Sequence, residues 1–190
     1  MKLVVISADL SPPSPTRVLA DRLADTTRWQ LTAHGHEVDT RVVELRDLAA
    51  DIAHVMETGS PGSDLRHAVK TVAQADGVIA VSPIFSASSS GLFKSFFDVL
   101  DNTTLTGKPV LLAATGATAR HSVTPERALR PLFSRLRATL VPTTVYAATE
   151  DWGAACLADR IVRAGRELGS LMGGRAAITE NTESVVPLKQ

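Results

Sequence analysis

Residues 78–81 read Val-Ile-Ala-Val, an apolar run without the alternation of a half-exposed strand. Two similar runs occur elsewhere in the chain: residues 3–6 read Leu-Val-Val-Ile, and residues 110–114 read Val-Leu-Leu-Ala-Ala. Continuous apolar strands are typical of a parallel sheet that helices cover on both faces. The three runs therefore predict the buried centre of such a sheet.

Longer helical patterns alternate with strand patterns along the chain. The predicted strands are Leu3–Ser7, Glu37–Val43, Gly77–Ser82, Pro109–Thr115 and Leu140–Ala147. The predicted helices are Thr16–His34, Asp64–Ala75, Gly91–Leu100, Pro125–Ala138 and Asp151–Met172. This alternation predicts one doubly wound α/β domain, a three-layer sandwich whose five-stranded parallel sheet has the flavodoxin-like order 2-1-3-4-5. We expect the domain to span residues 1–174, and residues 175–190 to form a C-terminal tail or an arm that reaches a partner subunit.

The charge balance disfavours several classes of partner. Twenty basic and twenty acidic residues give the 190-residue chain no net charge, so no overall field attracts nucleic acid or an anionic membrane. No apolar run reaches the roughly 18 residues of a membrane span, and the apolar run at the N-terminus is too short for a signal peptide. The single cysteine, Cys156, allows no internal disulfide and favours a reducing compartment. We therefore expect a cytoplasmic protein.

The loop after the first strand carries a candidate anion site. In an open α/β sheet, ligands bind beyond the carboxyl ends of the strands, near the switch in strand order. This loop places Ser11, Ser14, Thr16 and Arg17 at the start of the first helix. Free N–H groups, the helix dipole and hydroxyl donors favour an anion there, and Arg17 adds positive charge. The cluster predicts a phosphate site; the alternative is an ordinary N-cap serine in a proline-rich turn.

The absence of two motifs limits which phosphate-containing ligands are expected. Neither Gly-x-Gly-x-x-Gly after the first strand nor Gly-x-x-x-x-Gly-Lys-Ser/Thr occurs in the sequence. Their absence disfavours a dinucleotide held in the Rossmann manner and a P-loop nucleotide. A single terminal phosphate held by hydroxyls fits better, and flavin mononucleotide (FMN) carries such a phosphate.

Two further loops are expected beside this phosphate site. The backbone of residues 83–90 can offer N–H groups to the pyrimidine edge of a flavin, and Phe85 can cover its ring. In the loop after the fourth strand, Gly116 permits close approach of the backbone to a flat ligand. Arg120 and His121 are polar groups at the rim of the same loop.

No convincing cluster of catalytic side chains accompanies these loops. The sequence lacks Ser-His-Asp, Cys-His and metal-ligand spacings, and Asp98 and Asp101 fit a solvated helix face. This suits hydride transfer, in which the cofactor carries the chemistry and the protein positions it. Aromatic residues make up only 4% of this neutral chain, which favours a reductase with an open flavin face over an acidic electron carrier.

Four segments carry a resemblance to a known family. They are Ser14-x-Thr16, Pro83-x-Phe85-x-x-Ser88-x-x-Gly91-x-x-Lys94, residues 115–121 (Thr-Gly-Ala-Thr-Ala-Arg-His) and residues 151–153 (Asp-Trp-Gly). Together they resemble the NADPH-dependent FMN reductase family, and within it the actinobacterial reductases that are paired with luciferase-like monooxygenases.

The sequence departs from the family pattern at three positions. Phe85 stands where tyrosine is usual, Ser90 where proline is usual, and Ala117 where a second glycine is usual. None of these changes removes a catalytic acid, because the resemblance implies none. They bear on the affinity and pose of the flavin.

The loops and the resemblance together give a set of candidate site residues. The candidate FMN-binding residues are Ser11, Ser14, Thr16, Arg17, Pro83, Ile84, Phe85, Ser86, Ser88, Thr115, Gly116, Ala117 and His121. Arg120 is the candidate contact for the cosubstrate, where it would favour the 2′-phosphate of NADPH over NADH. We expect no metal site.

The leading interpretation is an FMN reductase that transfers a hydride from NADPH or NADH to FMN. Its reduced flavin would then supply a separate, two-component monooxygenase. The alternatives are a quinone or azo reductase that keeps its FMN bound, a flavin-binding electron carrier, and a non-catalytic interaction protein of the same fold.

The helix predicted at 91–100 suggests an assembly. Leu92, Phe96 and Val99 supply the stripe that faces the sheet, so Phe93 and Phe97 are expected on a neighbouring, exposed face. Exposed aromatic pairs are common interface anchors, and the pattern predicts a homodimer through this helix. The resemblance likewise implies dimers or tetramers. The alternative is that both rings pack under a loop.

Overall fold

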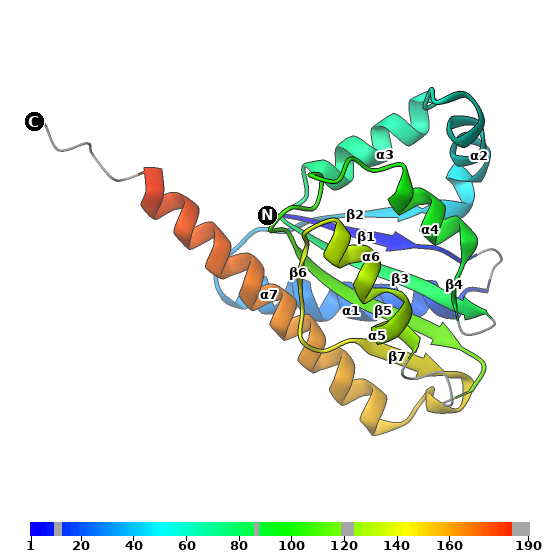
Figure 1. Cartoon of the computed structure of the whole chain (residues 1–190). Helices are drawn as coiled ribbons and strands as arrows, with labels where there is room; N and C mark the ends of the chain where they lie inside the picture. Colours follow the sequence, from blue (N-terminus) through cyan, green and yellow to red (C-terminus); the bar gives the residue numbers. More distant parts are fainter. Residues whose placement is uncertain (10–12, 86–87, 119–123, 184–190) are drawn as a thin grey trace, which may run out of the picture.

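The computed structural model describes residues 1–9, 13–85, 88–118 and 124–183, leaving aside the side chains of residue 124 and of residues 177–183. Helices cover both faces of a central sheet (Figure 1). The strands are β1 (Lys2–Ser7), β2 (Asp39–Glu44), β3 (Gly77–Phe85), β4 (Ser88–Ser89), β5 (Pro109–Gly116), β6 (Thr139–Leu140) and β7 (Val145–Ala148). The helices are α1 (Pro15–Ala33), α2 (Ala49–Thr58), α3 (Ser63–Ala73), α4 (Gly91–Asp98), α5 (Thr124–Ala128), α6 (Arg130–Arg135) and α7 (Ala155–Glu183), with 3-10 turns at Leu45–Leu48 and Thr149–Asp151.

The sheet has the order predicted from the sequence. Parallel strands run β2-β1-β3-β5-β6, and β7 also pairs with β5. The fifth predicted strand is thus present in two parts, since β6 pairs with the start of β5 and β7 with its end. Pro142 lies between the two parts and has no N–H for a ladder hydrogen bond. The flavodoxin-like order is confirmed, with an interrupted edge strand.

The apolar runs are buried on both sides of the sheet. Leu3 and Val5 of β1 pack in a core beneath α1 and α7, while Val4 and Ile6 pack in a second core beneath α2, α3, α4 and α6. Side chains alternate between the faces of a strand. A strand with a hydrophobic core on each face therefore needs apolar residues at every position, as the sequence has.

Helix α7 lies against α1 over much of its length and extends beyond the sheet (Figure 1). Two glycines of α7 allow the close approach: a Cβ at Gly165 would lie 2.7 Å from the side chain of Thr26, and one at Gly169 would lie 2.8 Å from Gln30. The helix continues to Glu183, past the predicted end at Met172. No helix within the described part of the chain is long and apolar enough to cross a membrane.

Two helical regions of the structure differ from the prediction. Helix α2 was not predicted, because Ile52 is its only buried residue and a single apolar position gives no periodic signal. The helix predicted over 125–138 is divided into α5 and α6, next to Pro131 at the start of α6. A proline lacks the N–H that would continue the helical ladder.

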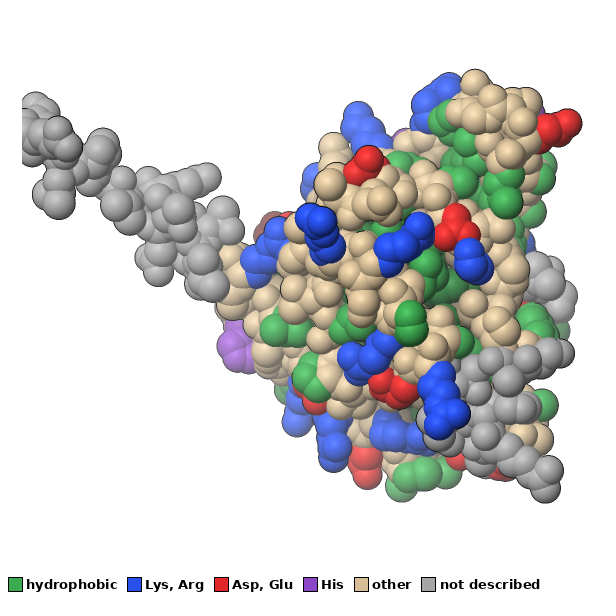
Figure 2. Space-filling model, viewed as in Figure 1, with side chains coloured by type: hydrophobic (Ala, Val, Ile, Leu, Met, Phe, Trp, Pro, Cys, Tyr) green, Lys and Arg blue, Asp and Glu red, His purple; other side chains and the backbone are tan. Residues whose placement is uncertain are grey.

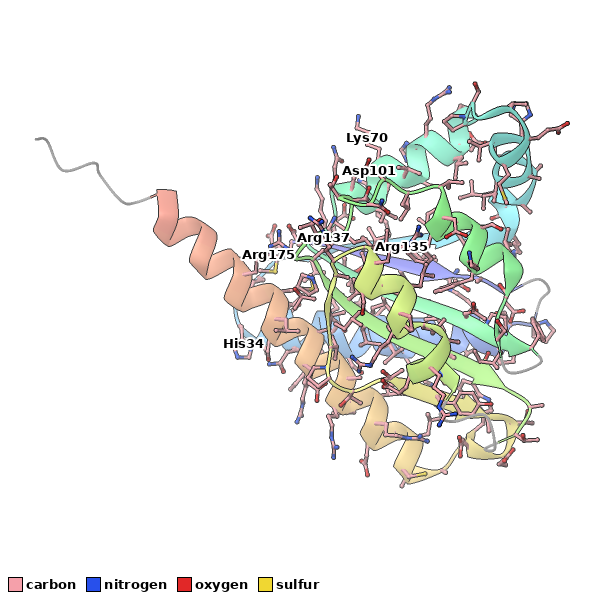
Figure 3. The ribbon with its side chains drawn as sticks, viewed as in Figure 1. His34, Lys70, Asp101, Arg135, Arg137 and Arg175 are labelled. Atoms are coloured by element: carbon pink, nitrogen blue, oxygen red, sulfur yellow. The ribbon has the colours of Figure 1, made fainter. Side chains whose placement is uncertain are left out.

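The amino-terminal ends of the strands are closed by basic side chains. Lys108 Nζ donates to the carbonyls of Val72 (2.7 Å) and Ala73 (2.8 Å), the last residues of α3. Burial, reinforced by repulsion from Arg175, lowers the pKa of Lys108 to about 8. Arg175 donates to Gly107, whose N–H donates to the carbonyl of Arg137, and the two arginines lie near each other at this end in Figure 3. Lys108 and Arg175 thus both donate hydrogen bonds to backbone carbonyls at this end of the sheet.

Charges on the face covered by α4–α6 are mixed in sign. Basic and acidic side chains lie beside one another there rather than in one block (Figure 2). Asp98, for example, pairs with both Lys94 and Arg135. This distribution matches the balanced composition of the chain.

The prediction that Phe93 and Phe97 are exposed interface anchors is wrong. Both are fully buried, as are Phe96 and Phe133. The ring centroids of Phe93 and Phe97 lie 4.7 Å apart, and those of Phe97 and Phe133 lie 4.6 Å apart. Helix α6 covers the side of α4 that the sequence pattern left exposed, so these rings form part of the core rather than a dimer contact.

Replacing Phe97 with alanine should therefore destabilise the fold of the individual chain. The lost burial and the cavity left behind should lower the free energy of unfolding by about 3–5 kcal/mol, measured by urea denaturation. Phe85→Ala is the matched control, because Phe85 is 54% exposed, and should change this free energy by less than about 0.5 kcal/mol. A Phe97→Ala protein with unchanged stability but altered sedimentation would restore the interface interpretation.

Candidate functional site

A cavity of about 350 Å³ opens at the carboxyl ends of the parallel strands. The carboxyl ends of β3, β5 and β7 contribute to its wall, together with residues that follow β1, β5 and β7, as expected for a ligand site in an open α/β sheet. The lining residues are Asp9, Pro15, Thr16, Pro83, Ile84, Phe85, Thr115, Gly116, Ala117, Ala147, Thr149 and Trp152. Its size is within the usual range for small-molecule sites.

Two threonines in the wall of this cavity are joined through their hydroxyl groups. Thr16 at the start of α1 and Thr115 near the end of β5 are both buried, and their hydroxyl oxygens lie 2.8 Å apart. The hydroxyl of Ser7, on the same face of β1 as Val5, is buried without a hydrogen-bond partner among the described residues. Buried hydroxyls without partners are uncommon. Polar groups are therefore concentrated where α1 meets the strand ends.

The start of α1 is fixed by a serine cap. Ser14 has extended backbone angles, and its hydroxyl accepts a hydrogen bond from the Arg17 N–H (2.8 Å) while donating to the carboxylate of Asp9 (2.7 Å). Pro15 occupies the first helical position, where its missing N–H costs nothing. The helix thus presents its positive end to the cavity, with an acidic side chain beside it.

Arg17 is not among the residues that line the cavity. Its guanidinium bonds to Asp21 (2.8 Å) and to Glu44 at the end of β2 (2.6 Å). The hydrogen bonds to these two carboxylates raise the pKa of Arg17 above its usual value. Its charge is therefore directed along the outside of α1, away from the predicted phosphate position.

The carboxyl end of β3 supplies one wall of the cavity. Pro83, Ile84 and Phe85 line it, and the chain turns back into β4, where Ser88 pairs with Phe85. Ser90 then caps α4 by accepting from the Phe93 N–H (3.1 Å). Ser88 itself does not line the cavity, and the predicted contact Ser86 lies outside the described residues.

Tyr146 supports the end of β5 and the residues that follow it. Thr115, Gly116 and Ala117 line the cavity, and the Tyr146 hydroxyl donates to the carbonyl of Thr118 (2.8 Å). A Cβ at Gly116 would lie 2.1 Å from that hydroxyl. Glycine at this position thus makes room for Tyr146, a reason that the sequence interpretation did not include.

The Tyr146 hydroxyl remains a donor across the physiological range. Burial, together with the nearby carboxylates of Glu150 and Asp151, raises the pKa of Tyr146 above its usual value.

The predicted contacts Ser11, Arg120 and His121 lie outside the described residues.

Sequence reasoning missed five residues of the wall: Asp9, Pro15, Ala147, Thr149 and Trp152. Trp152 belongs to the Asp-Trp-Gly segment of the resemblance but was given no role. It also lines an adjoining cavity of about 280 Å³ with Pro13, Ser14, Pro15 and Val18. The guanidinium of Arg22 lies 5.3 Å from the centroid of its ring, which holds the indole against α1.

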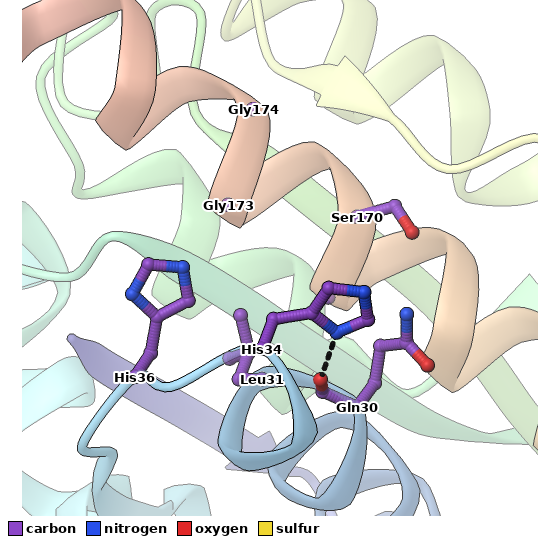
Figure 4. Close-up of a pocket in the computed structure, with 8 residues that line it drawn as sticks. Gln30, Leu31, His34, His36, Ser170, Gly173 and Gly174 are labelled. Carbon is purple, nitrogen blue, oxygen red and sulfur yellow. Dashed lines mark hydrogen bonds between the residues drawn. The ribbon is translucent and has the colours of Figure 1, made fainter.

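A larger cavity of about 410 Å³ lies between α1 and α7 (Figure 4). His34, His36 and Gln30 line one side, and Gly173 and Gly174 the other. His34 Nδ1 lies 2.8 Å from the carbonyl of Gln30. No strand end contributes to this cavity, so it lacks the converging loops that distinguish the first one.

Comparison with known proteins identifies the family. The family model described as NADPH-dependent FMN reductase matches residues 1–153, which include all four strand ends around the cavity. The chain belongs to the NADPH-dependent FMN reductase family. It is an NAD(P)H:FMN oxidoreductase, and its cofactors are FMN and a nicotinamide nucleotide, as the sequence predicted.

Individual relatives of this reductase share most of its length. An FMN reductase (NADPH) of Pseudomonas aeruginosa is 34% identical over 93% of this chain and 95% of its own. The NADH-dependent FMN reductase SfnF of Pseudomonas putida is 35% identical over 79% of this chain and 78% of its own. The solved structure of an oxidoreductase from Corynebacterium diphtheriae is 43% identical, with a TM-score of 0.88 over 91% of this chain and 97% of that one.

The Tyr146 contact of the reductase can be tested directly. Tyr146→Phe removes the hydrogen bond to Thr118 while keeping the ring, and should lower FMN affinity about three- to tenfold because the loop after β5 loses its support. The measurement is flavin fluorescence titration. Thermal unfolding should show only the loss expected for one hydrogen bond. Unchanged FMN affinity in this variant would show that the loop after β5 does not hold the flavin.

Proposed function

We propose that the reductase binds FMN in the cavity at the carboxyl ends of its strands and releases reduced FMN to a two-component monooxygenase. The observation that carries the proposal is the convergence of four strand-end segments and the start of α1 on one cavity. The cavity offers the two environments that FMN needs. A hydroxyl-lined region at the positive end of a helix suits the phosphate, and apolar walls suit the ring.

Each side of the cavity has a role in this proposal. Ser14 and Thr16, with Ser11 of the same loop, hold the phosphate end. Pro83–Phe85 and Trp152 bound the ring, and the backbone of Thr115–Ala117 meets its edge. Further contacts are proposed from the sequence alone, at Ser86, Ser88, Arg120 and His121. Arg17 is proposed to act through its bonds to Asp21 and Glu44 rather than by binding the phosphate.

The protein's part in the reaction is to position two flat rings. When bound, FMN supplies the hydride acceptor and NAD(P)H the donor. Hydride transfer requires the two rings to stack at near contact. Phe85 is 54% exposed at the mouth of the cavity, so the wall on its side leaves space for a second ring. We propose that the nicotinamide enters there, and that Arg120 favours NADPH.

The proposal also covers the setting of the enzyme. We propose that the enzyme is cytoplasmic, because its single cysteine favours a reducing compartment. We also propose that it assembles as a homodimer or homotetramer. Because Phe93 and Phe97 are buried, an interface has to use other side chains. Trp29 on α1 and Val162 on α7 are exposed apolar candidates, and the α7 segment beyond the sheet would extend such an interface.

The test is anaerobic flavin reduction with FMN in large excess over protein. The absorbance of oxidised flavin should be lost over many equivalents of FMN per protein after NADPH is added, because reduced FMN leaves the site. Thr16→Val, which keeps the side-chain shape but removes the buried hydroxyl, should raise the FMN concentration needed for half-maximal rate. Reduction of only one equivalent per protein would indicate a resident flavin and contradict release.

A further inference from the structure

The predicted phosphate position is poor in positive charge. Within the described residues, neither the cavity beneath the start of α1 nor the cavity that adjoins it is lined by lysine or arginine. Arg17, the basic residue of this loop, is bound to two carboxylates. Among the described residues, a phosphate at this position would find hydroxyl and N–H groups and the helix dipole, but no cationic side chain in the cavity wall.

Several backbone and side-chain donors of this loop are lacking or already engaged. Pro12, Pro13 and Pro15 have no backbone N–H. The Arg17 N–H is already bonded to Ser14 Oγ. The Ser14 hydroxyl, which is the most obvious donor to a phosphate, donates its hydrogen bond to the carboxylate of Asp9 at 2.7 Å. A phosphate that binds here has to take this donor from Asp9.

Asp9 lies beside the position proposed for the flavin phosphate. Its carboxylate lies in the cavity wall with Thr16, close to the positive end of α1, and accepts the hydrogen bond of the capping residue. An anionic side chain is stabilised at a helix N-terminus by the same dipole that attracts a phosphate. The two anions therefore compete for one set of donors, and they also repel each other.

We propose that Asp9 is a built-in competitor of the flavin phosphate, which lowers the affinity of the reductase for FMN without affecting phosphate-free flavins. The inference rests on the proposed function, because it requires the flavin phosphate to bind at the start of α1. Asp9 thereby reduces the preference for FMN over riboflavin and favours departure of the reduced flavin. Asp9 acts on binding and takes no part in hydride transfer.

The decisive variant is Asp9→Asn. Asparagine keeps an oxygen that can accept the Ser14 hydrogen bond, so the cap is retained while the charge is removed. One unit charge a few ångströms from a phosphate, at a partly exposed site, corresponds to about a tenfold change in binding constant. We expect Asp9→Asn to lower the dissociation constant of FMN about tenfold and to change that of riboflavin by less than about twofold.

Two controls separate this effect from general changes. Asp25→Asn removes the same charge from an exposed position on α1 that pairs with Arg28, and should leave the affinity for both flavins unchanged. Raising the salt concentration should reduce the difference between wild type and Asp9→Asn, because salt screens partly exposed charges. Circular dichroism and thermal unfolding establish that both variants are folded.

The outcomes distinguish the inference from the proposed function. A selective gain for FMN supports the inference. If Asp9→Asn leaves FMN affinity unchanged or weakens it, or if it changes FMN and riboflavin affinities equally, Asp9 does not compete with the phosphate, while flavin reduction by wild type still supports the proposed function. If FMN and riboflavin bind wild type and every variant without measurable difference, no phosphate site exists at the start of α1 and both are wrong.

Discussion

The parallel pairing of β3 between β1 and β5 is the interaction on which the rest of the structure depends. Leu3 lies beside Gly77 and Val78 beside Val110, so the three apolar strands run in one direction and end at one edge. This pairing brings together Thr16 and Thr115, which are 99 residues apart in sequence and joined by a buried hydrogen bond. The cavity exists because each strand delivers its following segment to the same place.

Hydrogen bonds from side chains fix the conformation of the segments around the cavity. Ser14 is bonded to Asp9, Ser90 to Ser82, and Tyr146 to the backbone of Thr118. Such contacts give short loops a defined shape without regular secondary structure. They also mean that several polar groups near the candidate site already have partners, so that a ligand bound there would exchange one hydrogen bond for another instead of adding new ones.

Much of the fold follows from local sequence. The apolar runs specify the central strands because both of their faces are buried, and the loops after them could be located as ligand sites from topology alone. The parts that could not be predicted depend on packing between distant elements. Phe93 and Phe97 lie on a face of α4 that packs against Phe133 of α6, and α2 contributes a single buried residue.

The candidate site was predictable in its outline but not in its electrostatics. Pro83–Phe85 and Thr115–Ala117 lie where the strand order requires. The partners of Arg17 come from its own helix and from β2, and nothing in the local pattern indicates that Glu44 would reach it. Asp9 and Trp152 were missed because their contribution depends on how loops from opposite ends of the chain approach one another.

The most direct test of the account is a crystal structure of the protein grown with FMN. The account predicts the flavin at the carboxyl edge of the sheet, with its ring between Phe85 and Trp152 beside Thr115–Ala117 and its phosphate at the start of α1. A flavin found in the cavity between α1 and α7, beside His34 and His36, would contradict it.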